Sequence, residues 1–175
     1  MTPSRVPPLV SIVGKSNSGK TTLIEKLIPR LMARGLRVGT IKHDAHSFEV
    51  DHPGKDSYRH REAGARVVAL CSAERVFVTR KVASQPSLDE LVLDVFVGHV
   101  DLVLTEGFKR ADAPKIEVHR TERSPSLVCE PLGDNLVAVA SDKKWHVGVP
   151  CFDLNDADAI ADFIYRTFIV EAAEG

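Results

Sequence analysis

Residues 9–22 read LVSIVGKSNSGKTT, and this stretch decides the fold. Its first five residues are so densely apolar that they predict a strand buried on both faces of a parallel sheet. Residues 14–21 match the pattern G-x-x-x-x-G-K-[ST], the P-loop. Apolar residues then recur at three- and four-residue steps, which predicts a helix over residues 20–34 that Gly35 stops. Pro29 removes a backbone donor inside it and predicts a kink or an early end.

The rest of the chain alternates short apolar runs with amphipathic segments. A capping box at Ser87 predicts a helix, and Asn155 or Asp156 is expected to cap a last helix. The further predicted strands are residues 36–41, 66–70, 76–79, 101–105, 116–119 and 136–140. The residues expected on the core face of the helix after Ser87 are Leu88, Leu91, Val92 and Val95.

This alternation predicts an α/β fold, a P-loop NTPase-like three-layer sandwich with a mostly parallel sheet. We expect one nucleotide-binding domain over residues 1–175, with a flexible leader at residues 1–8. Residues 43–64 form the stretch with the least regular hydrophobic pattern. It is too polar to lie in a core and too long to be a simple connecting turn. It is a candidate switch or partner-binding loop.

Composition narrows the classes of protein. The 175 residues hold 23 Lys and Arg against 24 Asp and Glu, a net charge of −1, and 43% are hydrophobic. A near-neutral chain is not built to coat nucleic acid or an anionic membrane. The sequence has no apolar run long enough to cross a bilayer and no apolar signal segment at its start. Three scattered cysteines match no zinc or disulfide framework and suit a cytoplasmic location.

The P-loop pattern predicts a phosphate site, because each residue type that the pattern fixes has a physical task. The glycines let backbone N–H groups turn inward around phosphate oxygens, and the following helix directs its positive end at the anion. Lys20 can bridge the β- and γ-phosphates, and the Thr21 hydroxyl can ligate Mg²⁺. The residues expected to bind the nucleotide here are Gly14, Lys15, Ser16, Asn17, Ser18, Gly19, Lys20, Thr21 and Thr22.

Lys15 has two interpretations. It directly follows the first glycine, as does the lysine that crosses a dimer interface in P-loops of the class that includes nitrogenase iron protein and the Min-type ATPases. The second glycine of that variant motif is absent, since Ser16 stands there. A solvent-facing lysine is the other interpretation.

The carboxylate on the metal side is expected at the end of the strand over residues 101–105. Ligands of parallel sheets gather beyond the carboxyl ends of the strands. Asp101 begins this strand and lies about 16 Å from Glu106 at the usual rise. We therefore expect Glu106 to bind Mg²⁺, directly or through water, and to act in hydrolysis. Gly107 would allow its N–H to approach a γ-phosphate.

Residues 43–52 hold three histidines and three acids, which could in principle bind zinc. No ligand spacing typical of zinc is present. A nucleotide-sensing switch, a partner-binding loop and a plain solvated loop are the other interpretations. Asp44, directly after a predicted strand, is a candidate catalytic acid that orients water or faces Mg²⁺.

Three stretches together resemble one family. They are the P-loop over residues 14–22, the segments TIKHD and DHPGKDS within residues 40–57, and EGFK with PKIEV within residues 106–118. The chain is similar to MobB-type adapter proteins of molybdopterin-guanine dinucleotide biosynthesis. The resemblance implies a dimeric GTP-binding protein with weak Mg²⁺-dependent GTPase activity. It also implies a MobA-type nucleotidyltransferase partner, which attaches GMP to molybdopterin during molybdenum cofactor maturation.

Guanine selection is carried mainly by this resemblance, because the N-K-x-D base-reading motif is absent. Asp142, just after a predicted strand, could accept hydrogen bonds from guanine N1 and N2, or could be a plain surface acid.

Two alternatives remain open. A P-loop small-molecule kinase would need an arginine-bearing lid, which Arg59, Arg61 and Arg66 could imitate. A non-hydrolysing carrier of the pterin cofactor would use nucleotide only to set its conformation.

Charge is unevenly distributed along the chain. Residues 1–120 hold 19 basic and 14 acidic side chains, whereas residues 121–175 hold 4 basic and 10 acidic side chains. The excess of basic side chains in residues 1–120 favours binding of anionic small molecules such as GTP and a phosphorylated pterin.

Overall fold

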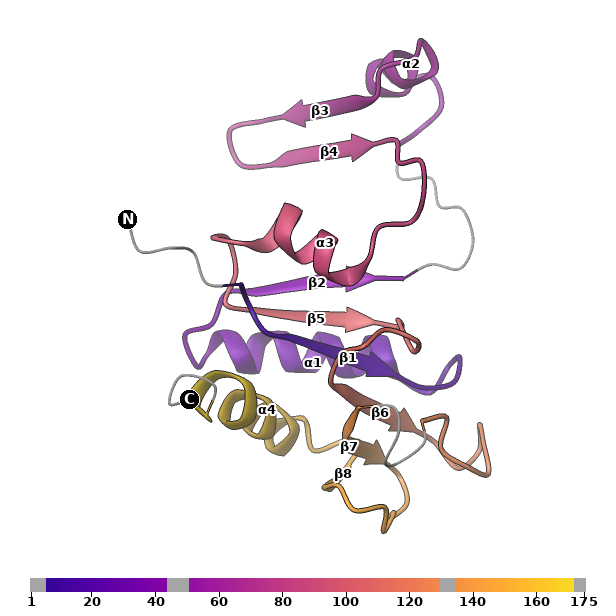
Figure 1. Cartoon of the computed structure of the whole chain (residues 1–175), viewed down its shortest axis with the longest axis vertical. Coiled ribbons are helices and arrows are strands. Elements are labelled where there is room, and N and C mark those ends of the chain that lie inside the picture. The colour runs from indigo at the N-terminus through magenta and orange to yellow at the C-terminus, as the bar shows by residue number, and fades with distance from the viewer. Residues whose placement is uncertain (1–5, 44–50, 130–134, 172–175) are drawn as a thin grey trace. The chain divides into compact units, whose positions relative to one another are not determined.

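The computed structural model describes residues 6–43, 51–129 and 135–171 (Figure 1). The chain forms two compact units. We call Met1–His43 with Leu88–Gly175 the core unit, and Asp44–Ser87 the hairpin unit. The assignment of residues 1–175 to one nucleotide-binding domain stays a prediction. No helix within the described ranges is long and apolar enough to cross a bilayer.

The core unit is built on a parallel sheet. Across its described residues, six strands pair in the order β2-β5-β1-β6-β7-β8, and every pairing is parallel. The strands are β1 (Leu9–Val13), β2 (Val38–Lys42), β5 (Leu102–Glu106), β6 (Lys115–His119), β7 (Leu136–Ser141) and β8 (Cys151–Asp153). The predicted α/β class and mostly parallel sheet are confirmed. The three-residue β8 was not predicted, because a run this short carries no periodic signal.

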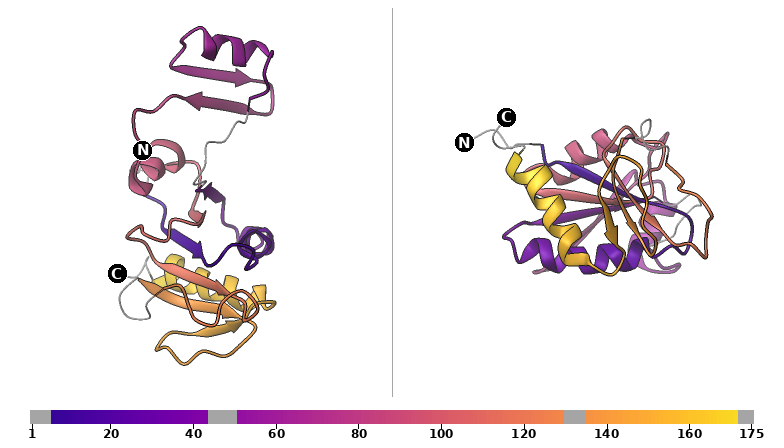
Figure 2. Two further views of the ribbon diagram at one scale, coloured as in Figure 1. Left: turned by 90° about the vertical axis from the view of Figure 1, so that its right-hand side faces the viewer. Right: turned by 90° about the horizontal axis from the view of Figure 1, so that it is seen from below.

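Helices cover both faces of this sheet, which makes three layers. Figure 2 shows α1 (Lys20–Met32) and α4 (Ala157–Tyr165) together on one face and α3 (Leu88–Leu91) on the other. Apolar side chains of α1 and α4 pack with those of the strands in one core cluster. The Asp156 side chain accepts from the N–H of Ala159 and caps α4, as one of the two predicted caps.

Helix α1 follows its apolar period. Leu23, Ile24, Leu27 and Leu31 are its buried residues. The helix continues through Pro29 to Met32, so an early end at the proline is wrong. Its exposed position explains the tolerance, since only one intrahelical hydrogen bond is lost on the solvent side.

The helix after Ser87 is wound differently from the prediction. After four residues, α3 gives way to a π-helical segment over Val92–Phe96. Wider winding shifts the side-chain phase, so Val95 is 49% exposed rather than on the core face. Phe96 packs on the sheet instead, at β2. A Cβ at Gly39 would lie 2.5 Å from its ring, so any larger residue there would force Phe96 to shift.

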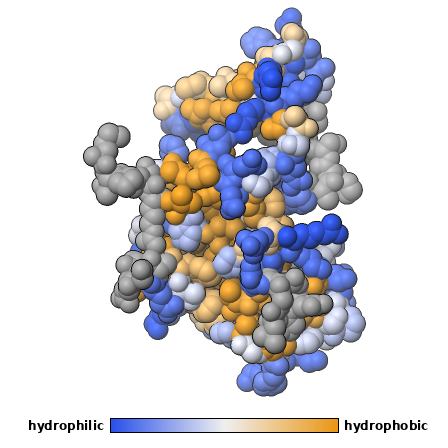
Figure 3. Space-filling model, viewed as in Figure 1, coloured by the Kyte–Doolittle hydropathy of each residue, from blue (hydrophilic) through white to orange (hydrophobic). Residues whose placement is uncertain are grey.

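The hairpin unit contains the other two predicted strands. β3 (Val67–Cys71) and β4 (Val76–Arg80) pair antiparallel with each other and not with the main sheet. The short helix α2 (Asp56–Glu62) precedes them, inside the segment predicted to be irregular. Figure 3 shows apolar side chains on the surface of this unit. Among the described residues of this unit, 51–87, the exposed large apolar ones are Val67, Leu70, Val76, Val78 and Val82.

Candidate nucleotide-binding site

The candidate site lies at the carboxyl edge of the parallel sheet. β1 runs into the P-loop, β5 ends at Glu106, and β7 is followed directly by Asp142. Because all these strands run parallel, their carboxyl ends share one edge. The structure therefore places the predicted phosphate loop, metal-side acid and base-reading acid at the same edge.

The P-loop turns tightly against β6. Gly14 has a φ of 143°, and a Cβ there would overlap the carbonyl oxygen of Val118 and lie 2.9 Å from Ser18 Oγ. Gly19, at the N-cap of α1, has a φ of 102°. Asn17 also adopts a positive φ, of 60°. These conformations give the loop its turn, and neither glycine could be replaced without strain.

Lys20 reaches back under the loop. Its Nζ donates to the carbonyl oxygens of Lys15 at 2.8 Å and Gly14 at 3.2 Å. Burial lowers the pKa of Lys20, Glu106 opposes that change, and Lys42 adds to it. The ammonium group is thus held at the loop, and Lys42 and Glu106 lie close enough to change its pKa.

Thr21 and Glu106 meet across the site. Thr21 Oγ1 lies 2.9 Å from Oε1 and 3.0 Å from Oε2 of Glu106, and its hydroxyl donates to the carboxylate. Hydroxyl and carboxylate oxygens are the ligands that Mg²⁺ prefers. The donor set at this point fits Mg²⁺ in chemical type.

Gly107 does not play its predicted part. Its backbone N–H donates to the carbonyl of Ile12 at 3.0 Å, so it is engaged rather than directed toward a γ-phosphate. The φ values of 96° at Gly107 and 55° at Phe108 turn the chain there. His43 continues the pairing of β2 with β5 by donating its N–H to the Glu106 carbonyl at 3.0 Å.

Asp142 is hydrogen-bonded to Thr121, two positions after the end of β6. Its Oδ1 accepts from the Thr121 backbone N–H at 3.0 Å and from the Thr121 hydroxyl at 2.9 Å. Hydrogen bonding by Thr121, first through its backbone N–H, holds the pKa of Asp142 below its usual range. The side chain is exposed and carries a negative charge that a base could meet.

Arg120 and Thr121 are site residues that sequence reasoning missed. Arg120 Nε donates to the Ser18 carbonyl of the P-loop at 3.1 Å. Arg120 directly follows the last residue of the buried strand β6 and Thr121 comes next, whereas Glu106 is itself the last residue of β5. The strand-end rule that selected Glu106 would have selected them too.

The remaining predicted residues are distributed as follows. Lys15, Ser16, Asn17 and Thr22 are exposed, whereas Ser18 is buried. Asp44 and most of the segment 43–52 lie outside the described residues. Arg59 and Arg61 belong to α2 and Arg66 precedes β3, all within the hairpin unit. Within the described ranges, no group of three His, Cys, Asp or Glu side chains could hold a metal ion.

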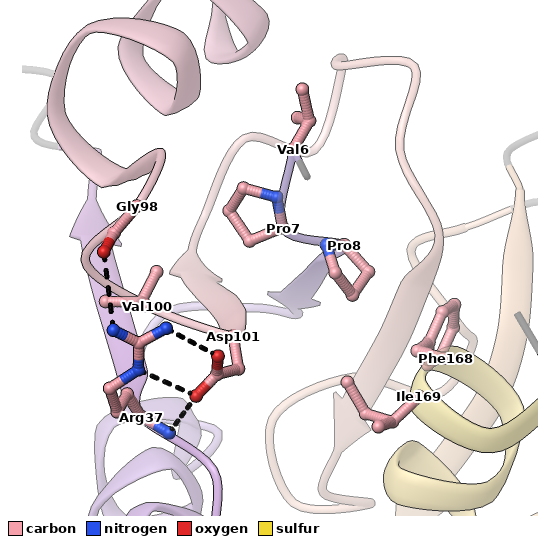
Figure 4. Close-up of a pocket in the computed structure, with 9 residues that line it drawn as sticks. All are labelled: Val6, Pro7, Pro8, Arg37, Gly98, Val100, Asp101, Phe168 and Ile169. Carbon is pink, nitrogen blue, oxygen red and sulfur yellow. Dashed lines mark hydrogen bonds and ion pairs between the residues drawn. The ribbon is translucent and has the colours of Figure 1, made fainter. Parts of the chain in front are cut away.

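Asp101 lies at the opposite, amino edge of the sheet, as expected. Figure 4 shows it facing Arg37, whose side-chain nitrogens donate to both carboxylate oxygens at 2.7 and 3.0 Å. Together with Phe168 and Ile169 the pair lines a cavity of about 280 Å³. Asp101 is therefore committed to Arg37 and takes no part in the phosphate site.

Comparisons with known proteins identify the family to which the chain is related. Residues 9–142 match the family model "Molybdopterin guanine dinucleotide synthesis protein B", MobB. A molybdopterin-guanine dinucleotide biosynthesis adapter protein of Haemophilus influenzae is 43% identical over 90% of this chain and 87% of its own. The protein of that name in Escherichia coli is 40% identical, over 90% of this chain and 91% of its own.

Solved structures of MobB proteins have the same fold as this chain. The crystal structure of Bacillus subtilis MobB superposes with a TM-score of 0.74 at 32% identity, covering 92% of this chain and 98% of that one. A family match over most of the chain, relatives at 40% identity or more and the same fold lead to one conclusion. The chain belongs to the MobB family.

Proposed function

We propose that this protein is a GTP-binding adapter in molybdopterin-guanine dinucleotide biosynthesis. Membership of the MobB family supports the assignment to this biosynthetic pathway. The observation that carries the nucleotide part is the contact of Thr21 of the P-loop with Glu106, with Asp142 following β7 at the same edge of the sheet. On this proposal, the bound nucleotide sets the state in which the adapter assists a MobA-type nucleotidyltransferase that joins GMP to molybdopterin.

The phosphates would bind in the P-loop, at the N-terminus of α1. The thirteen-residue helix directs its positive end at the loop, and its first turn holds no acidic residue. Lys20 is already held beside the loop through two carbonyls, so its charge would be positioned before the nucleotide arrives. This preorganisation favours tight binding of a triphosphate.

Thr21 and Glu106 would hold Mg²⁺ with their adjacent oxygens. When bound there, Mg²⁺ neutralises charge on the phosphates during hydrolysis. Hydrolysis is expected to be slow, because the Gly107 N–H that could donate to a γ-phosphate is hydrogen-bonded to Ile12. Slow turnover suits an adapter, whose nucleotide state must outlast its encounter with a partner.

Asp142 would select guanine over adenine. Guanine presents the N1–H and N2–H donors that a carboxylate can accept, whereas adenine presents no donor at N1. Hydrogen bonding from the Thr121 backbone lowers the pKa of Asp142 and so favours its charged, accepting form. Trp145, the single tryptophan of the chain, lies three residues further on and is partly buried, so its fluorescence should report on this site.

The hairpin unit would make the protein a homodimer by pairing with a second copy. Cross-strand partners Ala69 with Val78 and Cys71 with Val76 share one face of the hairpin. On this face Val76 is 67% and Val78 is 56% exposed. An identical apolar face on a second chain could bury both by two-fold symmetry.

Light scattering on V76E/V78E tests the dimer. The variant should be monomeric at concentrations where the wild type is dimeric. E74Q is the matched control, since it changes a charge on the turn of the same hairpin without touching the apolar face. A wild-type monomer, or a dimer that survives V76E/V78E, would contradict this part of the proposal.

GMP transfer to molybdopterin by a MobA-type transferase tests the adapter role. Adding the wild-type protein with GTP should raise the yield of dinucleotide, and adding K20A should not. Release of phosphate without transfer to molybdopterin distinguishes the adapter from a kinase, which would phosphorylate the pterin. No effect of the wild-type protein on the transferase would refute the proposal.

A further inference from the structure

Two consecutive residues contact both halves of the proposed nucleotide site. Arg120 Nε donates to the Ser18 carbonyl in the P-loop at 3.1 Å. Thr121 donates its N–H and its hydroxyl to Asp142 Oδ1, at 3.0 and 2.9 Å. One short segment after β6 thereby joins the phosphate loop to the carboxylate expected to read the base.

We propose that Arg120 and Thr121 are positioning residues that set the P-loop and Asp142 relative to each other. Arg120 holds the phosphate loop, Thr121 holds the base-reading carboxylate, and their shared backbone links the two. This inference rests on the proposed function, because it takes the P-loop as the phosphate site and Asp142 as the base-reading acid.

The guanidinium of Arg120 lies along the end of the P-loop. A Cβ on Gly19 would lie 3.7 Å from both Arg120 Nε and Arg120 Nη2, so the planar group packs beside the last residue before Lys20. Only Nε is used by the hydrogen bond to Ser18. An arginine has five donors in a fixed fork, so one can hold a carbonyl while the charge stays at the loop.

Thr121 leaves Asp142 able to accept more hydrogen bonds. Its two donors converge on Oδ1, whereas Oδ2 lies at the longer distance of 3.3 Å from the Thr121 N–H. A carboxylate oxygen has two lone pairs. Thr121 thus fixes the direction of the carboxylate and keeps acceptor capacity for a base.

The ends of β6 and β7 are held together beneath this segment. His119 is buried, with Nδ1 3.1 Å from Ser141 Oγ and Nε2 3.0 Å from the Ser124 carbonyl oxygen. His119 precedes Arg120, and Ser141 precedes Asp142. His119 and Ser141, the residues before Arg120 and Asp142, are therefore in contact. Because of this contact, a movement of Arg120 is transmitted to Asp142 rather than absorbed by a flexible strand end.

The base half is tested with Thr121→Val, which removes the hydroxyl but keeps the N–H and the branched shape. We measure Kd for GTP and for ITP, which lacks the exocyclic N2 amine, and for inorganic tripolyphosphate. The variant should lose about threefold to tenfold of the wild-type preference for GTP over ITP. Its affinity for tripolyphosphate should be unchanged, and Thr121→Ser should restore the preference.

The phosphate half is tested with Arg120→Gln. Tripolyphosphate affinity should fall by about tenfold. The GTP-to-ITP preference should fall as well, because the segment that carries Thr121 is loosened, which a purely electrostatic role would not produce. Arg120→Lys should recover part of the tripolyphosphate affinity but not the preference, since a lysine lacks the fork. Arg166→Gln is the matched control, an exposed arginine near the C-terminus whose Nε lies 2.9 Å from Asp162, and should change neither.

Thermal unfolding confirms that each variant is folded, and Thr121→Ser and Arg120→Lys serve if the others are not. The inference is overturned if Arg120→Gln behaves as Arg166→Gln does, or if Thr121→Val keeps the full GTP-to-ITP preference. Failure of the proposed function has a different signature, in which the wild-type protein binds no GTP. A wild type whose preference depends on Asp142 but not on Arg120 or Thr121 refutes the inference alone.

Discussion

Thr21 Oγ1 lies 2.9 Å and 3.0 Å from the two carboxylate oxygens of Glu106, although the residues are 85 positions apart in sequence. The contact exists because β1 and β5 are neighbouring parallel strands, with Ile12 paired to Glu106. The first residues of α1 are therefore brought to the end of β5. A hydroxyl and a carboxylate side by side beside the phosphate loop are the basis for placing Mg²⁺ there.

Glu106→Gln should slow GTP hydrolysis more than it weakens GTP binding. The amide keeps the shape and can still accept from Thr21, but it loses the charge that draws Mg²⁺. We expect turnover to fall by at least about tenfold, measured as phosphate release at saturating GTP, with Kd changed far less. Glu25→Gln, an exposed acid on α1, is the control. Equal losses of turnover and affinity would count against a role for Glu106 beyond binding.

Asp142→Asn should change which base is preferred. The asparagine oxygen can take over the hydrogen bonds from Thr121, leaving the amide N–H₂ facing the base. An amide there donates to the C2 carbonyl of xanthine and no longer accepts from guanine N1 and N2. Affinity for GTP should fall by about tenfold or more, and that for XTP should rise, as followed by Trp145 fluorescence. Unchanged GTP and XTP affinities would show that Asp142 does not read the base.

Glu117→Gln should destabilise the core unit. Glu117 is fully buried, and its two carboxylate oxygens accept from the N–H groups of Val128 at 2.7 Å and Cys129 at 2.8 Å. Glutamine has one acceptor oxygen and would turn its amide N–H₂ toward the other backbone donor. Urea unfolding should show a loss of about 1–3 kcal/mol. The exposed Glu122→Gln should cost far less, and equal stability of the two variants would contradict this role of Glu117.

Asp101 should contribute to stability in a pH-dependent way. Hydrogen bonding from the Arg37 side chain lowers the pKa of Asp101 in the folded protein. A carboxylate with a lowered folded-state pKa stabilises fully above its unfolded value, about 3.9, and loses that contribution as pH falls through the folded-state pKa. The Tm of Asp101→Asn should thus lie below that of the wild type at pH 7, and the gap should narrow below about pH 4. A gap that stays constant with pH would contradict the assignment.

The P-loop and the parallel sheet could be predicted because their signals are local. The strand over Leu9–Val13, the glycine-rich turn and the apolar stripe of α1 all lie within one continuous stretch. The place of Glu106 followed as well, because the carboxyl ends of parallel strands share an edge. The phase of Val95 was missed because a π-helical turn leaves no mark in an apolar period.

The pairing of β3 with β4 and the contacts of Arg120 could not be predicted in the same way. Short strands at residues 66–70 and 76–79 were expected, but their length and composition do not say which strand each one joins. Arg120 reaches a carbonyl of Ser18, 102 positions away, and a backbone acceptor carries no sequence signal. Gly107 was misjudged for the same reason, since its N–H is bound by the carbonyl of Ile12.

The most direct test of the central claim, that this protein binds GTP in its P-loop, is titration calorimetry with GTP and ATP in Mg²⁺, on the wild type and on Lys20→Ala. GTP should bind one site per chain, ATP at least about tenfold more weakly, and Lys20→Ala should bind GTP at least about a hundredfold more weakly while remaining folded. A folded wild-type protein that gives no GTP binding, or Lys20→Ala with unchanged GTP affinity, would contradict the account.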